Sequence, residues 1–392
     1  MNDFDDIRPY HDSEVPSALA RMIADPELMD LLLSREFPRM TKILPGVFTR
    51  LARPFLRRKL RKLMVEVSTV SDFQAHMTSR LISVLETTTD SYGFNGLDKT
   101  PSDKVHLYMS NHRDIALDPA MVNLGLFLEN RAMVRIAIGD NLLSKPFAAD
   151  LMRINRSFIV KRSVKGRREK LEALKNLSRY IRHSISQEKV PIWIAQAEGR
   201  AKDGQDRTET ALLKMLALSK DKDQSFAAAI GELNIVPVAI SYEYDPCDAE
   251  KASELYAQQR GLTYTKDPFE DLDSIVKGFL GYKGRIQVNF GDPVADKYED
   301  ADGLAAEVNR QIGLNYQLFP TNIIAWTMQV AEQKLDVLES LKSLWPKEDW
   351  LYAEQQFRDH IGALPNEHRA IAVAAYAAPV DNQLHYLSQQ GH

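Results

Sequence analysis

Residues 105–119 read VHLYMSNHRDIALDP. The first five are mostly apolar and predict a short strand, while the apolar pattern over residues 118–129 predicts a helix. The polar residues between them therefore lie at the carboxyl end of a strand, the edge of the sheet where α/β proteins bind ligands. A short apolar strand followed at once by a helix is typical of an α/β layer structure with a buried sheet.

The same alternation continues along the chain. A charged helix is predicted over residues 164–186, and the glycines within residues 92–96 predict a loop. Further strands are predicted over residues 134–138, 157–160, 190–195, 235–242 and 285–290. We expect an α/β fold with a mixed, mostly buried sheet flanked by helices. The expected domains are a helical N-terminal region at 1–100, the α/β domain at 101–300 and a helical C-terminal region at 301–392.

Composition restricts the class of protein. The chain has 50 Lys and Arg against 54 Asp and Glu, and its hydrophobic share of 44% is that of an ordinary globular protein. Cys247 is the only cysteine, so neither an internal disulfide nor a Cys-rich zinc cluster can form, and a reducing compartment fits best. The first residues are acidic, unlike a signal peptide. No stretch of about 20 apolar residues is present for a membrane span.

Positive charge is concentrated between Arg35 and Lys62, where ten basic residues stand against one acid. This part of the chain also carries an apolar stripe at helical spacing, formed by Leu56, Leu60, Leu63, Met64 and Val67. Because basic amphipathic helices lie on anionic membrane surfaces, we predict a membrane-surface segment at residues 35–67. Its assigned cations are Arg53, Arg57, Arg58, Lys59, Arg61 and Lys62. Alternatively, the stripe packs on the protein's own core. Nucleic acid is disfavoured because aromatic residues do not alternate with the basic ones.

His112 is the first candidate for chemistry, since it follows a predicted strand. An acid in the first turn of the next helix can bond one ring nitrogen and leave the other free as a base. Asp114 and Asp118 both fit this description. Asp is also favoured at helix N-termini without any catalytic role.

Two further motifs place polar groups after strands. Residues 155–168 read NRSFIVKRSVKGRR, in which basic residues lead toward a helix start that suits a phosphate. Residues 193–204 read WIAQAEGRAKDG. There Glu198 can accept a hydrogen bond from a hydroxyl, and Arg200 can bind phosphate oxygens in a bidentate manner. Each motif alone is equally compatible with an exposed turn.

Together, four motifs in this order resemble the glycerolipid acyltransferase superfamily, which includes glycerol-3-phosphate and lysophosphatidate acyltransferases. That family's blocks are His, four residues, Asp; an apolar strand ending in Arg; Pro/Val-Glu-Gly-x-Arg; and a Pro-containing strand such as Val-Pro-Val. Here five residues separate His112 from Asp118, and no residue separates Gly199 from Arg200. The fourth block is present as residues 236–238. The resemblance covers about residues 103–260.

The resemblance implies roles for these residues. His112 would deprotonate the acceptor hydroxyl, which attacks the thioester of acyl-CoA or acyl-carrier protein. Asp118, which is followed by a proline and an apolar helix, is the preferred partner of His112, and Asp114 is the alternative. The implied substrate-binding set, for the acceptor's phosphate and glycerol hydroxyl, is Arg113, Lys161, Arg162, Lys165, Glu198, Gly199 and Arg200. Neither a metal nor a cofactor beyond the acyl donor is implied.

We therefore predict an O-acyltransferase of phospholipid synthesis that acts on glycerol-3-phosphate or 1-acylglycerol-3-phosphate. The expected setting is cytoplasmic, peripherally associated with the inner face of the membrane. Its partners would be the acyl donor, the acceptor and an anionic membrane surface, but no nucleic acid. The alternatives are a catalytically silent lipid-surface binding protein of the same fold and an acyl-thioester hydrolase, in which water replaces the acceptor.

Overall fold

In the computed structural model, residues 4–44, 46–143, 145–264, 270–294, 297–330 and 335–390 are described. The chain divides into two units, each built from two separate segments. The first unit comprises Met1–Leu81 and Val134–Tyr180, and the second comprises Ile82–Met133 and Ile181–His392. This division does not follow the three consecutive regions expected from the sequence, whose domain boundaries stay a prediction.

A mixed sheet forms the centre of the second unit. Its strands are β1 (Ser91–Asn95), β7 (Arg285–Phe290), β6 (Ile235–Tyr242), β2 (Leu107–Ser110) and β5 (Ile192–Ala195), in that spatial order. β6 is antiparallel to β7, whereas the other neighbouring pairs are parallel. Every residue of β2 and β6 is buried, which explains their continuous apolar sequences. The predicted fold class, a mixed α/β sheet flanked by helices, is confirmed.

One prediction about this sheet is wrong. Residues 92–96 were expected to form a loop, but β1 pairs in parallel with β7 along its whole length. Gly93 and Gly96 allow this part of the chain to pack closely against β7. A Cβ on Gly93 would lie 2.6 Å from a side-chain oxygen of Gln287, and one on Gly96, where φ is +83°, would lie 2.0 Å from the backbone oxygen of Phe290.

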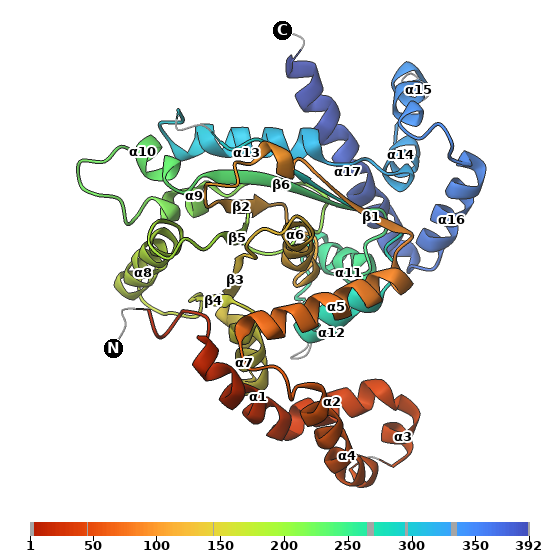
Figure 1. Ribbon diagram of the computed structural model, residues 1–392. Coiled ribbons are helices and arrows are strands. Elements are labelled where there is room, and N and C mark those ends of the chain that lie inside the picture. Colours follow the sequence, from red (N-terminus) through yellow and green to blue (C-terminus); the bar gives the residue numbers. More distant parts are fainter. Residues whose placement is uncertain are drawn as a thin grey trace. The chain divides into compact units, whose positions relative to one another are not determined.

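Helices cover both faces of this sheet. α13 (Ala301–Asn315) packs on β6, and α6 (Leu117–Leu128) lies on the other side (Figure 1). The C-terminal helices α14 (Pro320–Thr327), α15 (Leu335–Ser343), α16 (Trp350–Gly362) and α17 (Asn366–Gln390) share an apolar core around Trp326 and Phe357. The unit's remaining helices are α9 (Thr210–Leu216), α10 (Phe226–Gly231), α11 (Asp248–Gln259) and α12 (Glu270–Leu280).

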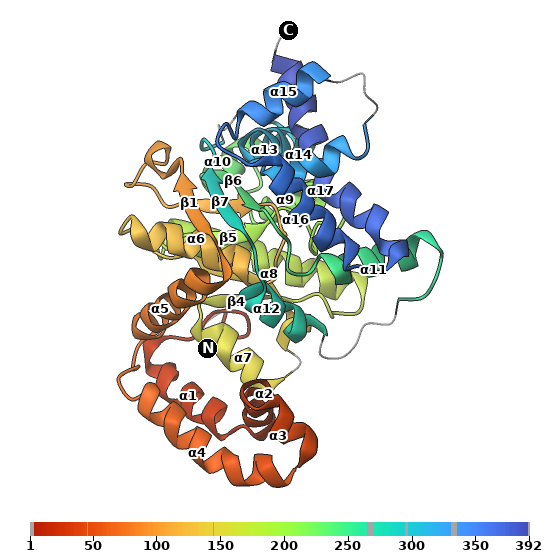
Figure 2. The same cartoon turned by 90° about the vertical axis from the view of Figure 1, so that its right-hand side faces the viewer.

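The first unit begins with four helices: α1 (Val15–Ala24), α2 (Pro26–Glu36), α3 (Pro38–Ile43) and α4 (Val47–Leu63). α2, α3 and α4 lie side by side (Figure 2). The unit also holds the parallel strands β3 (Arg135–Gly139) and β4 (Ser157–Val160), with α7 (Pro146–Ile154) between them. The chain passes between the two units within α5 (Val70–Thr88) and α8 (Arg167–Ser186). None of the described helices is both long and apolar enough to cross a bilayer.

Candidate active site

The loop between β2 and α6 is fixed to the neighbouring strand by one side chain. Asn111 donates from Nδ2 to the carbonyl of Ile240, 2.9 Å away, and accepts from the backbone N–H of Ile240 at 2.8 Å. The side chain thus continues the β2–β6 pairing past the last strand residue, Ser110. Asn111 is fully buried. The next residue, His112, is therefore presented at a defined place at the carboxyl end of β2.

His112 forms a hydrogen bond with Asp118, with 2.9 Å between Nδ1 and Oδ2. Asp118 is fully buried at the start of α6, and Oδ2 also accepts the backbone N–H groups of Arg113 and Asp114, at 2.6 and 3.0 Å. A carboxylate at Nδ1 favours the tautomer in which that nitrogen carries the proton. The lone pair then lies on Nε2, the nitrogen available to act as a base.

Asp114 is buried like Asp118 but has a different function. Its Oδ1 accepts the N–H groups of Ala116 and Leu117, at 3.0 and 2.8 Å, and so satisfies backbone donors at the start of α6. Burial, reinforced by the negative charge of Asp118, raises the pKa of Asp114 to about 6. Of the two acids that the sequence offered, only Asp118 contacts the His112 ring.

Comparison with known proteins bears on this part of the chain. Residues 92–241 match the protein-family model described as Acyltransferase. This region is an acyltransferase domain. The match spans 150 of the 392 residues and contains both His112 and Asp118. It confirms, for this region, the resemblance inferred from the motifs.

Other comparisons add little to that result. Among solved structures, the chain matches the 1-acyl-sn-glycerophosphate (LPA) acyltransferase PlsC from Thermotoga maritima at 16% sequence identity and a TM-score of 0.33. The match covers 74% of this chain and 95% of that chain. The search of curated proteins found no match.

Within the acyltransferase domain, the loop after β5 lies beside the loop between β2 and α6, which carries His112 and is called the histidine loop below. β5 and β2 are parallel neighbours with Ala195 opposite Ser110, so both loops leave the same edge of the sheet. The backbone N–H of Ala201 donates to the carbonyl of His112 at 2.8 Å. The ring of Trp193 on β5 also contacts the imidazole edge to face, with 5.9 Å between the ring centroids. The Glu-Gly-Arg motif thus lies close to the histidine.

The three residues of that motif differ in exposure. Glu198 and Gly199 are exposed, whereas Arg200 is half-buried and its Nη2 lies 3.5 Å from the hydroxyl of Ser274. The Nη1 of Arg200 is buried and has no hydrogen-bond partner among the described residues. Gly199 has a φ of +82°, a conformation that suits glycine. Arg200 therefore keeps an unused donor near His112.

Arg113 is turned into the protein interior. Its guanidinium forms a buried ion pair with Asp206, at 2.7 Å, and donates to the carbonyl of Gly204 at 3.1 Å. It also lies over the ring of Tyr316, 5.4 Å from the centroid. These contacts tie the histidine loop to the segment after β5 and to the end of α13. The expected role of Arg113 in binding substrate stays a prediction.

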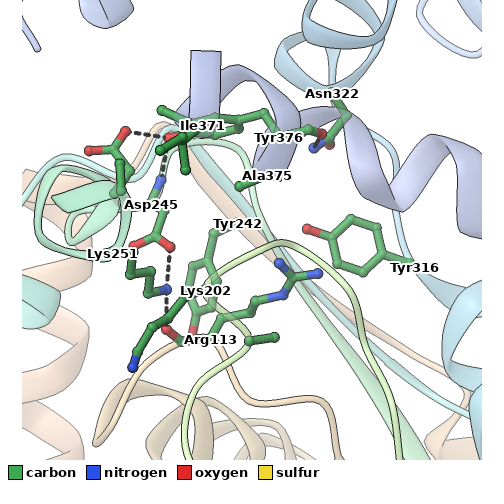
Figure 3. A pocket seen from close by; sticks show the side chains of 14 residues that line it. Arg113, Lys202, Tyr242, Asp245, Lys251, Tyr316, Asn322, Ile371, Ala375 and Tyr376 are labelled. Atoms are coloured by element: carbon green, nitrogen blue, oxygen red, sulfur yellow. Dashed lines mark hydrogen bonds and ion pairs between the residues drawn. The ribbon is translucent and has the colours of Figure 1, made fainter. Parts of the chain in front are cut away.

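A pocket lined in part by Arg113, Ala201 and Lys202 lies beside the loop that carries His112 (Figure 3). Its walls include the rings of Tyr242, Tyr316 and Tyr376, and the last of these comes from α17. Lys251 lines the pocket and donates to Asp245 and, from the same ammonium group, to the carbonyl of Arg113. The C-terminal helices thus form one wall of a cavity next to the histidine loop.

The remaining predicted substrate-binding residues belong to the first unit. Lys161, directly after β4, forms an ion pair with Asp6. The backbone N–H of Arg162 donates to Asp140 at 3.1 Å, and the side chains of Arg162 and Lys165 are exposed. Their assignment to the acceptor's phosphate stays a prediction. Among the described residues, no three His, Cys, Asp or Glu side chains gather as a metal site.

Sequence reasoning missed several supporting residues. Asn111, Asp206, Tyr242 and Lys251 hold the histidine loop, yet none belongs to a spacing pattern that identifies its partner. Their partners lie 93 to 138 positions away in the sequence, from the contact of Asp206 with Arg113 to that of Lys251 with Arg113. Only the strand pairing brings these segments together.

Proposed function

We propose that the protein transfers a fatty acyl group from acyl-CoA or acyl-carrier protein to a hydroxyl of glycerol-3-phosphate or 1-acylglycerol-3-phosphate. The observation that carries the proposal is the His112–Asp118 pair inside a matched acyltransferase domain. Nε2 of His112 takes the hydroxyl proton as the acceptor oxygen attacks the thioester carbon. The C–S bond then breaks, and the imidazolium returns the proton to the thiolate. Asp118 holds the ring and offsets the charge of the imidazolium.

Arg200 supports a phosphorylated acceptor. Its Nη1 is buried and has no partner in the part of the chain that the structure describes, and such a donor gains a charge-assisted hydrogen bond when a phosphate oxygen arrives. The exposed carboxylate of Glu198 can accept a hydrogen bond from a glycerol hydroxyl. We assign both residues to the acceptor. The assignment of Lys161, Arg162 and Lys165, which belong to the first unit, stays a prediction.

We further propose that the protein works at an anionic membrane surface such as the inner face. The predicted stripe does not make this contact, because Leu56 and Leu60 pack with Met29 and Leu33 in the apolar core between α4 and α2. We call α2 to α4 the helical hairpin. The helix α4 ends at Leu63, before the stripe is complete. These leucines therefore pack on the protein's own core, which is the alternative that the sequence left open.

A different face of α4 fits a membrane. Val47, Leu51 and Phe55 follow one another at intervals of four and are 58%, 68% and 78% exposed. The same face continues into the exposed cations Arg58 and Lys62. We call these five residues the exposed stripe. Exposed apolar groups next to exposed cations favour an anionic lipid surface over water.

The predicted cations divide into two groups. Arg53 bonds Asp30, Arg57 bonds the carbonyl of Ala24, and Lys59 forms an ion pair with Glu36, so these three hold the hairpin together. Arg58, Arg61 and Lys62 are exposed and form no ion pair with any described residue. The second group is the one that we assign to lipid phosphates.

The test of the activity follows free-thiol release from palmitoyl-CoA by the purified protein. Glycerol-3-phosphate, 1-acylglycerol-3-phosphate or no acceptor is added, and acyl-carrier protein replaces CoA in a parallel series. Release should depend on one acceptor and fall about 10²- to 10⁴-fold in His112→Ala. The matched control is His385→Ala, an exposed histidine on α17. Equal release without acceptor would identify a hydrolase, and no release with either donor would reject the proposal.

A further inference from the structure

Tyr242 approaches the histidine pair from a different strand. It is the last residue of β6, is 6% exposed, and donates from its hydroxyl to Oδ1 of Asp118 at 2.8 Å. Its ring forms part of the pocket wall, as Figure 3 shows. Burial, and next the charge of Asp118, raises the pKa of Tyr242 well above its usual value. The hydroxyl therefore keeps its proton and remains a donor.

The hydrogen bonds to Asp118 are divided unevenly between its oxygens. Oδ2 accepts three, from the His112 ring and from the backbone N–H groups of Arg113 and Asp114. Among the described residues, Oδ1 accepts only from the hydroxyl of Tyr242. All three donors to Oδ2 lie within six residues of Asp118 in the sequence. Tyr242 is the donor that fixes the carboxylate relative to the sheet.

We propose that Tyr242 is a positioning residue for the His112–Asp118 pair. This inference rests on the proposed function and adds a residue to it. A carboxylate oxygen that is buried without a donor is strained, so it turns toward any donor it can reach. The hydroxyl of Tyr242 removes that tendency and keeps Oδ2 aimed at Nδ1. It also withdraws negative charge from the carboxylate, which moderates how strongly Asp118 favours the protonated imidazole.

Charged groups from several elements act on the Tyr242, Asp118 and Asp114 side chains. They are Arg113 and Asp114 on the histidine loop, Asp206 after β5, Asp245 after β6, Lys251 on α11, and Lys283 before β7. None of them donates to Oδ1 of Asp118. Removal of the Tyr242 hydroxyl therefore leaves that oxygen without a replacement among the described residues.

The experiment is the pH dependence of acyl transfer in Tyr242→Phe. With one donor fewer, Asp118 favours the imidazolium more, so the acidic limb of kcat/KM should move to higher pH by about half to one unit. kcat on the plateau should fall about tenfold because Asp118 holds the His112 ring less precisely, and KM should stay nearly unchanged. Tyr282→Phe is the matched control, because its hydroxyl also donates to a carboxylate, Oδ2 of Asp90 at 2.6 Å, but neither lines the pocket nor bonds Asp118. Its profile should coincide with that of the wild type.

A second readout does not need turnover. The pH at which the His112 ring takes up its second proton is followed by NMR with labelled histidine, and the signal absent from His112→Ala identifies the residue. This midpoint should also rise by about half to one unit in Tyr242→Phe. In the background of Asp118→Asn, the same change should have no effect. A midpoint and a rate profile that both coincide with wild type would overturn the inference. Absent transfer with a shifted midpoint would reject the proposed function alone.

Discussion

The two buried acids of the histidine loop lead to a test of stability. Asp114 has an ordinary pKa of 3.8, which rises to about 6 in the folded protein because of burial and the nearby Asp118. The folded state therefore holds this proton more tightly than the unfolded state. The resulting stabilisation is complete below pH 3.8 and is lost as the pH rises through 6. The total loss is about 3 kcal/mol, of which about 2 kcal/mol falls between pH 4.5 and pH 8.

Asp114→Asn removes the titration and keeps the helix start. The asparagine oxygen can still accept the N–H groups of Ala116 and Leu117, which Asp114 accepts at 3.0 and 2.8 Å. Because the variant cannot ionise, it should gain about 2 kcal/mol over wild type between pH 4.5 and pH 8, which raises its relative Tm by about 4–8 °C.

Calorimetric unfolding of both proteins across this pH range measures the effect. The expected result is a difference in Tm that widens steadily as the pH rises and levels off above about pH 7. A constant difference would mean that Asp114 does not hold its proton in the folded protein. A difference that narrows with pH would mean that its carboxylate is stabilised by folding, and both results would refute the argument from burial.

Three other variants test the packing, the membrane face and a buried ion pair, each with its own control. Gly278→Ala should lower the free energy of unfolding by about 2 kcal/mol or more, because its Cβ would lie 2.0 Å from Oδ2 of Asp114. Thermal unfolding compares it with the control Gly362→Ala on α16, where no atom lies within 4 Å of the added Cβ. The double variant Leu51→Glu, Phe55→Glu should lose binding to phosphatidylglycerol vesicles in co-sedimentation and keep its Tm. The control Leu351→Glu, at a residue that is 83% exposed on α16, should bind as wild type does. Equal binding of wild type, double variant and control would remove the exposed stripe from the proposal. Arg285→Ala should cost about 3–5 kcal/mol in denaturant unfolding, because it leaves Glu243 buried without its 2.8 Å partner and removes a guanidinium 4.3 Å from the Trp345 ring. The exposed pair tested by Arg358→Ala should cost under about 1 kcal/mol.

The strands were predictable because their sequences record burial directly. β4, β6 and β7 occur over the ranges predicted from apolar runs, and the other predicted strands are within two residues. β1 was not predicted, because its glycines permit close contacts to β7 and carry no apolar pattern. The helices α7 and α9 to α12 were also missed, since they are short or lie in polar sequence.

The candidate site was predictable only where partners are close in sequence. His112 and Asp118 lie six residues apart, so the strand end and the helix start determine their contact. The sequence could not exclude Asp114, whose use of Oδ1 for the helix start depends on the exact geometry of the loop. Likewise, the apolar stripe of α4 could be recognised from spacing, but which of its two faces meets α2 depends on packing across the hairpin.

The C-terminal helices are part of the support of the candidate site, although the acyltransferase match ends at Ser241. Gly204, with φ at +75°, has no room for a Cβ because the backbone oxygen of Ala375 on α17 would lie 2.0 Å from it. The carbonyl of Gly204 in turn accepts from Arg113, which directly follows His112. Tyr376, on the same helix, accepts the backbone N–H of Asp245, the partner of Lys251. Two independent chains of contact thus run from α17 to the histidine loop, so the matched region without these helices would lose the groups that hold His112 in place.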